Sequence, residues 1–324
     1  MTAARGEAPG KIILLGEHAA VYGYPALAIP VHARRARATV ELTPGATIEL
    51  QAEGIGQSWR SGAVPPTGRD RLNPLAEAAE AALRFLGAPH TGILARLSST
   101  IPVACGMGSS AAVSVALVRA IAAALGRSLS AAEVAELVMV SERGFHGNPS
   151  GIDAEVISRD VPILFVKGQT AEVITPGASS FQFLVANSGI PSSTASVVGD
   201  VSQAYKRNEV RYAAIFREMG DLAVAGRAAL ETGTPRMLGR LMTRAHKLLQ
   251  EINVSSARLD ALADAAMSAG AAGAKLSGAG RGGNVIAVLN SPADRAAVRH
   301  ALTGAGAVDV CAECLEPVAV EAKR

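Results

Sequence analysis

Three glycine-bearing segments, far apart along the chain, carry residue types that can hold a polyphosphate. They are residues 9–18, 102–112 and 275–283. Glycine lets the backbone turn so that successive N–H groups point into one concavity, and such a concavity binds phosphate. Each segment alone is a weak signal. The three in this order, with a carboxylate-bearing segment between the second and the third, predict ATP-dependent phosphoryl transfer.

The second segment directly precedes a long apolar stretch that is predicted to be a buried helix. The first turn of a helix leaves N–H groups without partners and carries partial positive charge, so phosphate is a natural ligand there. The hydroxyls of Ser109 and Ser110 either cap this helix or reach a Mg²⁺ held by the phosphates. The residues predicted to bind the nucleotide are Pro102, Ala104, Cys105, Gly106, Met107, Gly108, Ser109, Ser110 and Ala111.

Other interpretations of the second segment remain open. The spacing Gly106-x-Gly108-x-x-Ala111 matches a dinucleotide-binding fingerprint. However, no strand stands immediately before it and no acidic residue follows at about 20 positions, as that fold requires. A tight turn with a serine cap also fits the segment taken alone. A Walker A loop is excluded, because Gly10-Lys11 is followed by isoleucine and lacks a glycine at the required offset.

The third segment has four glycines between residues 278 and 283 and is followed by the apolar run 284–289, a predicted strand. A dinucleotide fold would need a helix there. So many glycines cost conformational entropy, which a backbone that approaches a ligand closely explains better than a plain hairpin does. We therefore expect the backbone of Gly278, Ala279 and Gly280 to touch phosphate or substrate.

Glu142 is predicted to lie in the last turn of a helix that begins with a capping box at Ser130. The helix dipole disfavours a carboxylate at that end, so Glu142 needs a cation beside it. Mg²⁺ is one candidate. A salt bridge to Arg143 or to Lys11 is the alternative.

Asp153 is predicted at the third position of a short helix capped by Ser150. Its structural role would be that of a capping carboxylate, and its functional role would be to orient a substrate hydroxyl. The helix N-terminus and a nearby Lys11 both favour the ionised carboxylate, which makes it a weak base. A loose phosphoryl-transfer transition state needs no early proton abstraction. We therefore expect Asp153 to align the hydroxyl and take its proton late, while Lys11 neutralises charge near the γ-phosphate.

The composition excludes several classes of protein. Of 324 residues, 49% are hydrophobic and 18% charged, so the chain can bury a core. The net charge of +3 is mild and aromatic residues make up only 3%, so the basic stripe with aromatic platforms of a nucleic-acid binder is missing. The densest basic cluster, Arg34-Arg35-Ala36-Arg37, lies in a predicted strand and is interpreted as a solvated face.

No apolar run approaches the ~20 residues that span a bilayer, and the run 12–15 is too short for a signal-peptide core. We therefore expect a cytoplasmic protein. The odd count of three cysteines, Cys105, Cys311 and Cys314, argues against a disulfide framework. The C-x-x-C at Cys311 and Cys314 lacks the second pair of ligands that a zinc site needs.

Strands and helices are mixed without strict alternation, which predicts an α+β fold. Residues 51–71 are expected to form a surface excursion and 270–283 a turn-rich segment. A Pro/Gly/Ser stretch near 175–180 predicts a boundary between domains 1–178 and 179–324. Strands are predicted at 12–15, 26–31, 37–42, 93–97, 161–166, 183–186, 285–289 and 308–311, and helices at 74–86, 109–125, 130–143, 192–207, 209–230, 234–251, 255–269 and 292–303.

Over essentially its whole length the chain resembles the GHMP kinase superfamily. Its pattern Pro-x-x-x-Gly-Met-Gly-Ser-Ser-Ala-Ala at 102–112 is highly specific for that group. Within the group, residues 8–28 and 146–153 resemble mevalonate kinases most closely. Phosphomevalonate kinases tend to carry tyrosine where His18 stands, decarboxylases of the group lack Gly-Glu-His, and galactokinases follow it with a sugar motif absent here. The resemblance implies a ribosomal-protein-like N-terminal domain and a ferredoxin-like C-terminal domain, with the site in the cleft between them.

The resemblance also implies roles for single residues. Lys11 and Asp153 match the catalytic pair of the family, and Ser110 and Glu142 match its Mg²⁺ ligands. The residues implied to contact the substrate are Lys11, Glu17, His18, Asp153, Thr194, Gly278, Ala279 and Gly280.

Two positions depart from the family pattern. Arg281 replaces a usual glycine, and either adds a cation near phosphate or points to solvent. Ala154 replaces the asparagine that often follows the catalytic aspartate, which bears on substrate choice and not on kinase chemistry.

The activity implied by the resemblance is phosphorylation of the 5-hydroxyl of mevalonate by ATP and Mg²⁺, giving 5-phosphomevalonate and ADP in isoprenoid biosynthesis. Three alternatives are a kinase of the group acting on another small alcohol, such as phosphomevalonate or a sugar, a decarboxylating lyase, and a non-catalytic sensor. The intact Lys11, Glu142 and Asp153 argue against the sensor. We expect no nucleic-acid or membrane partner, and a homodimer is left open.

Overall fold

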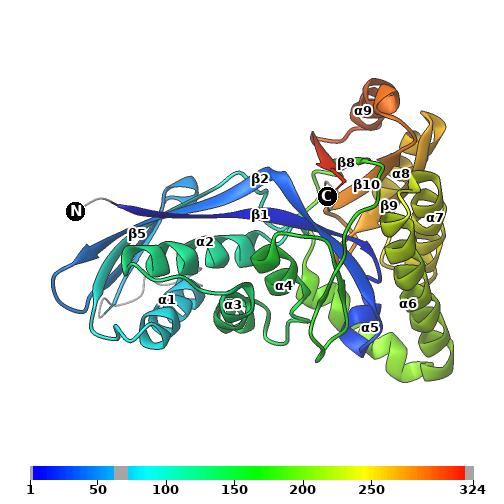
Figure 1. The fold of residues 1–324 in the computed structure, drawn as a ribbon. Coiled ribbons are helices and arrows are strands. Elements are labelled where there is room, and N and C mark those ends of the chain that lie inside the picture. The colour runs from blue at the N-terminus through cyan, green and yellow to red at the C-terminus, as the bar shows by residue number, and fades with distance from the viewer. Residues whose placement is uncertain (1–2, 62–71, 318–324) are drawn as a thin grey trace, which may run out of the picture. The chain divides into compact units, whose positions relative to one another are not determined.

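The computed structural model describes residues 3–61 and 72–317, and these fall into two compact units. The first unit contains the described parts of residues 1–11, 30–102 and 108–160. The second contains residues 12–29, 103–107 and the described part of 161–324. Both units mix helices with sheet strands, which confirms the predicted α+β class (Figure 1). The units interleave along the chain, so the single boundary predicted after residue 178 stays a prediction.

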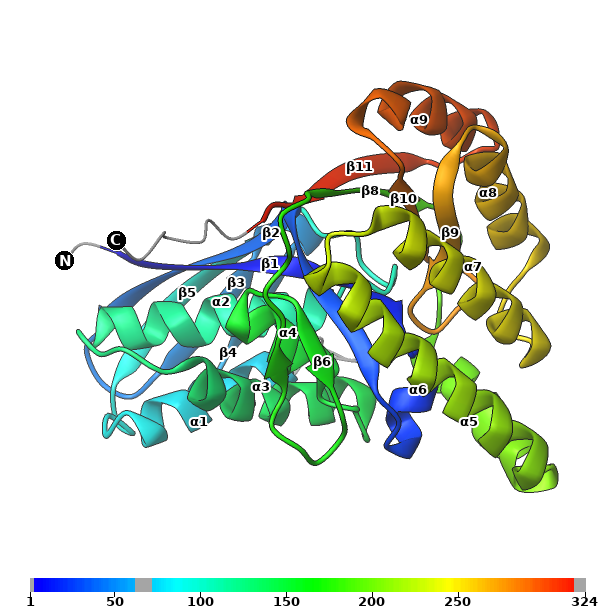
Figure 2. The same cartoon turned by 45° about the vertical axis from the view of Figure 1, so that its right-hand side comes forward.

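The first unit is a sheet with helices on one face (Figures 1 and 2). Within its described residues, the strand order is β4-β3-β5-β2, and β1 pairs with β2. The strands are β1 (Ala4–Leu15), β2 (Ala26–Thr43), β3 (Ile48–Ala52), β4 (Gln57–Arg60) and β5 (Gly92–Ser99). The helices are α1 (Asn73–Phe85), α2 (Ser109–Ala124), α3 (Ala131–His146) and α4 (Ile152–Arg159). Each of the strands β1 and β2 is divided between the two units. Residues 4–11 and 30–43 belong to the first unit, and residues 12–15 and 26–29 belong to the second.

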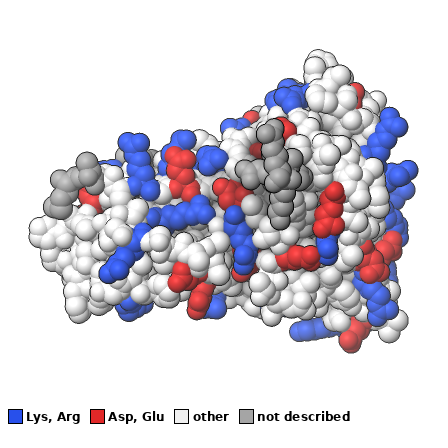
Figure 3. Space-filling model, in the orientation of Figure 1, with Lys and Arg blue, Asp and Glu red and all other residues white. Residues whose placement is uncertain are grey.

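A glycine in β1, and the alternation of buried and exposed residues in β2, allow this sheet to pack closely on its helices. A Cβ added to Gly6 of β1 would lie 2.1 Å from the carbonyl oxygen of Ala116 in α2, so only glycine allows this approach. In β2, Ala36 and Ala38 are buried while Arg37 is exposed. The basic cluster therefore lies along a strand with Arg37 on its solvated face, as interpreted from the sequence. In Figure 3 the Lys and Arg side chains on the visible face are interspersed with Asp and Glu.

In the second unit, the described residues form a four-stranded antiparallel sheet of order β11-β8-β10-β9. When only the four strands of this sheet are numbered along the chain, the order is 4-1-3-2 with helices after the first and third strands, which is the ferredoxin-like pattern that was predicted. The strands are β8 (Phe181–Asn187), β9 (Ala271–Ser277), β10 (Asn284–Leu289) and β11 (Asp309–Leu315). The helices are α5 (Thr194–Arg207), α6 (Glu209–Glu231), α7 (Pro235–Glu251), α8 (Ala257–Ser268) and α9 (Arg295–Gly304).

The core of this sheet comes from one set of alternating residues. Leu276 of β9 and Val285 of β10 are register partners, and both belong to a buried apolar cluster that includes Leu248 of α7 and Leu262 of α8. Period-2 alternation in a strand sends the neighbouring side chains to the opposite face. Smaller elements of the unit are the 3₁₀ turn η1 (Ala19–Tyr22) and the strands β6 (Ile163–Phe165) and β7 (Glu172–Val173).

Several predicted elements need correction. The strands predicted at 26–31 and 37–42 are one continuous strand, β2, because the backbone stays extended through Pro30 and the basic cluster. The turn-rich prediction for 270–283 is wrong over its first half, where β9 pairs with β10. Of the predicted excursion 51–71, residues 57–60 form β4, and 62–71 lie outside the described residues.

Two sequence-level expectations on membranes and cysteines can be compared with the structure. Across residues 3–61 and 72–317, none of the helices combines the length and apolar character needed to cross a membrane. Within the described residues, Cys105, Cys311 and Cys314 form no disulfide. Cys311 and Cys314 both lie on β11 at a spacing of three, which places them on opposite faces of the strand.

Candidate active site

The first unit brings Lys11 and Asp153 into direct contact. The Nζ atom of Lys11, on β1, lies 2.9 Å from Oδ1 of Asp153 in α4. The lysine side chain is 4% exposed and the aspartate side chain 27%, so this ammonium is desolvated while the carboxylate keeps access to a ligand. A carboxylate and an ammonium held in this way can align a hydroxyl group and neutralise charge that develops on a phosphoryl group.

Asp153 reaches this position from the second residue of α4, so the predicted third position is wrong. The N-cap is Gly151 in the left-handed conformation, and no side chain of the described residues caps the helix. The hydroxyl of Ser150 only accepts a long hydrogen bond from the Ile152 amide, 3.4 Å. Asp153 is therefore no capping-box residue, and its carboxylate is directed to Lys11 instead.

Gly108 lets Lys11 pass close to the N-terminus of α2. Its φ of 68° lies in the left-handed region, and an added Cβ would lie 2.9 Å from the Lys11 Cγ atom and from the Ile157 Cδ1 atom. Gly108 is also the N-cap of α2, and within the described part of the chain no side chain caps this helix. The serine-capped turn considered from the sequence is therefore wrong. The first turn of α2 keeps the uncapped N–H groups that suit a phosphate.

Glu142 of α3 is a buried carboxylate whose neighbouring charges and hydrogen bonds do not offset its loss of hydration. It is 3% exposed, and its Oε1 atom has no hydrogen-bond partner among the residues that the structure describes. Burial, and after it the charge of Asp153, raises the pKa of Glu142 to about 7, although the hydroxyl of Ser110 and the charge of Lys11 act in the opposite direction. Because α3 continues to His146, Glu142 precedes the last turn and does not lie in it as predicted.

His146 connects Glu142 with Ser110 and was not identified from the sequence. Its Nε2 atom is 3.2 Å from the Ser110 hydroxyl and 3.9 Å from a Glu142 oxygen. Burial lowers the pKa of His146, so it is a weak substitute for a permanent cation. Among the described residues, His146 is the basic group that pairs with Glu142, and the predicted salt bridge to Arg143 or Lys11 is not formed. The i,i+4 spacing of Glu142 and His146 on one helix was the signal available in the sequence.

The donors at Glu142 fit a Mg²⁺ ion. A buried carboxylate oxygen without a partner stands beside the Ser110 hydroxyl. No group of three or more His, Cys, Asp or Glu side chains that could hold a metal occurs in the part of the chain that the structure describes. A cation here would thus take one carboxylate and one hydroxyl from the protein and further oxygens from its ligand. Mg²⁺ is commonly bound in this way, through few carboxylates and substrate phosphates.

In the second unit, His18 is anchored to the third glycine segment. Its Nε2 atom lies 2.9 Å from the carbonyl oxygen of Ala279. Burial lowers the pKa of His18 to about 4, so the ring is neutral at pH 7. A carbonyl only accepts, so Nε2 carries the proton and Nδ1 is left as an acceptor. His18 also has a φ of 61°, in the left-handed region that side chains rarely adopt.

Lys275 is a second residue that sequence reasoning missed. It is fully buried on β9, and its ammonium is bonded to the Glu17 carboxylate and to the carbonyl oxygen of Leu276. Burial lowers the pKa of Lys275, and Glu17 acts against this shift. The sequence predicts turns in this segment, where a lysine is unremarkable. A single charge within the apolar run 271–276 was the available signal.

The second and third glycine segments meet within the second unit. A Cβ added to Gly106 would lie 3.3 Å from the carbonyl oxygen of Ser277, and one added to Gly283 would lie 3.0 Å from that of Cys105. The Asn284 side chain donates a 2.6 Å hydrogen bond to the same Cys105 carbonyl. At Ser277 and Gly283, the backbone of the third glycine segment therefore closely approaches the backbone of the second glycine segment.

The remaining predicted positions lie elsewhere. Thr194 is the first residue of α5 and is exposed. Arg281 neither points freely into solvent nor stands unpaired, because it is bonded to Asp200 and to the Asn253 carbonyl oxygen. Ala154 is buried. The roles assigned to these residues and to the clusters above stay predictions.

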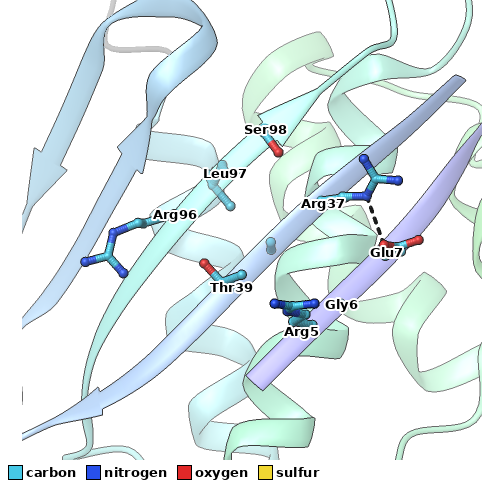
Figure 4. Close-up of a pocket in the computed structure, with 9 residues that line it drawn as sticks. Arg5, Gly6, Glu7, Arg37, Thr39, Arg96, Leu97 and Ser98 are labelled. Atoms are coloured by element: carbon cyan, nitrogen blue, oxygen red, sulfur yellow. Dashed lines mark hydrogen bonds and ion pairs between the residues drawn. The ribbon is translucent and has the colours of Figure 1, made fainter. Parts of the chain in front are cut away.

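A groove of about 320 Å³ lies on β1, β2 and β5 of the first unit. It is lined by Arg5, Gly6, Glu7, Arg37, Ala38, Thr39, Arg96, Leu97 and Ser98. Figure 4 shows Arg37 paired with Glu7, at 2.9 Å. None of the predicted site residues lines this groove. Its arginines include two that are already paired, since Arg96 also contacts Glu41.

Comparison with known proteins agrees with the two-domain architecture. The pattern of the GHMP kinases N terminal domain matches residues 73–158, and that of the GHMP kinases C terminal domain matches residues 227–308. The chain is 35% identical over 294 residues to the mevalonate kinase of Aeropyrum pernix, covering 89% of each chain.

Solved structures share the fold. The L. major mevalonate kinase in complex with R-mevalonate superposes with a TM-score of 0.81 at 27% identity, covering 98% of this chain and 96% of that one. The phosphomevalonate kinase of Streptococcus pneumoniae, at 17% identity, also reaches 0.81 over 95% of this chain and 99% of that one. The fold alone therefore does not select the alcohol that is phosphorylated.

Proposed function

Because the chain belongs to the GHMP kinase family, we propose that it phosphorylates the 5-hydroxyl of mevalonate with ATP, giving 5-phosphomevalonate and ADP in isoprenoid biosynthesis. The similarity to the Aeropyrum pernix protein over 89% of the chain supports mevalonate as the substrate. The observation that carries the proposal is the Lys11–Asp153 pair, which lies beside the N-terminus of α2 through the contact of Lys11 with Gly108.

In this proposal the first turn of α2 holds the phosphates. The uncapped N–H groups after Gly108 and the dipole of the 16-residue helix favour anionic oxygens. The burial of α2 fixes this end in space: Ser114 of α2 and Ser141 of α3 are both buried, and their hydroxyls are 2.7 Å apart. The hydrogen bond locks α2 against the helix that carries Glu142.

Asp153 orients the primary hydroxyl of the substrate and receives its proton as the bond to phosphorus forms. Lys11 stabilises the charge on the transferring group and holds the Asp153 carboxylate in place through their 2.9 Å contact. Because the transition state is loose, positioning contributes more than base strength. The carboxylate needs only to be correctly placed, which its contact with a buried ammonium ensures.

Ser110 and Glu142 are proposed to hold Mg²⁺ together with oxygens of ATP. When bound, Mg²⁺ supplies positive charge that offsets the charge on the β- and γ-phosphates. Burial raises the pKa of the Glu142 carboxyl to about 7, so a divalent cation bound beside it would favour its ionised form. His146 holds the Ser110 hydroxyl in place through its 3.2 Å contact.

Further residues are proposed to contact mevalonate: Glu17, His18, Thr194 and the backbone of residues 278–280. Neutral His18 offers Nδ1 as an acceptor for a hydroxyl group. A cytoplasmic location is part of the proposal, because the reaction consumes ATP.

The proposal is tested with purified chain, ATP and MgCl₂ against a panel of alcohols, with coupled detection of ADP. The panel contains mevalonate, phosphomevalonate, homoserine and galactose. We expect ADP formation that depends on mevalonate, with no release of CO₂. Preference for another alcohol of the panel would reject mevalonate as the substrate, and CO₂ release would indicate a decarboxylase. Absence of ADP with every alcohol would reject kinase activity.

A further inference from the structure

We propose that Lys275 is a positioning residue for the alcohol substrate, because its buried ammonium holds the Glu17 carboxylate and so fixes the Glu17–His18 turn. The inference rests on the proposed function, in which Glu17 and His18 contact mevalonate. Lys275 itself belongs to the second unit, as do both of these residues.

Lys275 occupies a place where an apolar residue would be expected. It is 0% exposed, and its register partner on β10 is Ile286. Its neighbours Ala274 and Leu276 belong to the apolar cluster, so alternation directs Lys275 to the other face of the sheet. A fully buried ammonium is costly without a partner, and replacing such a pair with apolar residues is often neutral or stabilising. The Lys275–Glu17 pair is thus poorly explained by stability alone.

The backbone around Glu17 needs external anchors. Gly16 has a φ of 92° and His18 a φ of 61°, so two residues in the left-handed region flank Glu17. Such conformations persist when surrounding contacts impose them. Glu17 is bonded to Lys275, and His18 is bonded to Ala279, so both anchors come from one five-residue stretch of the third glycine segment.

A third contact fixes the same stretch against β1. The Ser277 hydroxyl lies 3.2 Å from both the amide nitrogen and the carbonyl oxygen of Ile13. Residues 275–279 therefore hold residues 13–18 in position through these three contacts. Of the three contacts just described, the one from Lys275 to Glu17 joins two charged groups. Its loss should release Glu17 and change the direction of the His18 ring, which affects binding of the alcohol and not of ATP.

The kinetic test uses Lys275→Met, Glu17→Gln and the double variant, with Lys247→Met as a matched control. Lys247 is exposed on α7. We expect Lys275→Met to raise KM for mevalonate by about tenfold or more, the effect of losing a hydrogen bond to a charged group. KM for ATP should change by less than about twofold, as for a site that shares no partner with the mutated one. A folded Lys275→Met enzyme with unchanged KM for mevalonate would overturn the inference.

The double variant shows whether Lys275 acts through Glu17. If it does, Glu17→Gln with Lys275→Met should be no worse in KM for mevalonate than the more impaired single variant. Multiplied single effects would mean that Lys275 acts independently of Glu17, against the inference. The double variant leaves no unpaired buried charge, so its comparison with Glu17→Gln still decides the question if Lys275→Met fails to fold.

A readout without substrate separates this inference from the proposed function. Nitrogen-15 shifts of the His18 ring report its tautomer, which is expected to be the Nε2–H form in the wild type and the Lys247→Met control. In Lys275→Met, or in the double variant if the single one does not fold, we expect a mixture of tautomers. An unchanged His18 spectrum would overturn the positioning role, even if mevalonate proved not to be the substrate.

Discussion

Replacing Glu142 with glutamine separates the functional use of this carboxylate from its effect on stability. The group is buried, and its pKa is raised from 4.5 to about 7, mainly by desolvation. In the unfolded chain the carboxyl loses its proton near pH 4.5. Between pH 4.5 and 7 the folded state therefore binds a proton that the unfolded state has released, and stability falls as the pH rises through this window. Above pH 7 both states are ionised and the loss is complete.

The size of this effect follows from the shift. At 1.36 kcal/mol per pKa unit, the penalty on the folded state is about 3 kcal/mol at pH 8 and about 1 kcal/mol at pH 5.5. The difference between these two pH values is about 2 kcal/mol. Glutamine cannot ionise and carries no such dependence. Any constant cost of its amide group cancels when each protein is compared with itself at the two pH values.

The assay is urea unfolding in EDTA at pH 5.5 and pH 8 for the wild type, Glu142→Gln and the control Glu136→Gln. Glu136 is exposed on the same helix. We expect Glu142→Gln to gain about 2 kcal/mol relative to the wild type on going to pH 8, while Glu136→Gln follows the wild type. In kinetic assays Glu142→Gln should need more MgCl₂ for its half-maximal rate and lose turnover. Parallel pH dependences for wild type and Glu142→Gln would refute the reasoning.

Two further predictions concern His18 and Gly108. The pKa of His18 is lowered from 6.5 to about 4, so stability should fall as the pH drops through that window, when only the unfolded state gains the proton. His18→Asn should remove about 2 kcal/mol of that loss between pH 7 and 4.5 in urea unfolding, and equal slopes in both proteins would argue against a buried neutral ring. Gly108→Ala should cost about 1 kcal/mol for its left-handed backbone and also reduce turnover, because its methyl group meets the Lys11 side chain. Gly23→Ala has the same backbone cost with open space around it, so it should retain turnover, and equal losses in both variants would show that the Lys11 contact is irrelevant.

Local patterns predicted the helices well, because their signals lie within a few residues. The capping box at Ser130 and Glu133 is present, and α2 and α6 lie within a residue of their predicted bounds. The strands depended on distant partners. β9 contains five small residues and a lysine, so little in its composition favours a strand, and it becomes a strand through pairing with β10. Tertiary context overrides propensity most easily in such segments.

The sequence predicted which residues form the candidate site, but not the contacts that these residues make. Spacing and resemblance indicated Lys11, Ser110, Glu142 and Asp153, which lie together in the first unit. The sequence could not show that Gly151 rather than Ser150 caps α4, since that depends on a left-handed backbone torsion. Lys275 was missed for a related reason. Its importance lies in complete burial beside Glu17, 258 residues away in sequence, which no local pattern records.

In the proposed mechanism the Lys11–Asp153 pair performs phosphoryl transfer. The variant Asp153→Asn tests this role most directly. Asparagine preserves the shape of the side chain and removes its ability to take the proton. Turnover with saturating ATP and mevalonate should fall at least about a hundredfold, as for loss of a general acid–base group. The dissociation constant for ATP should stay within about twofold, because Asp153 acts on the acceptor alcohol. Retained turnover, or equal losses in turnover and ATP affinity, would contradict the account.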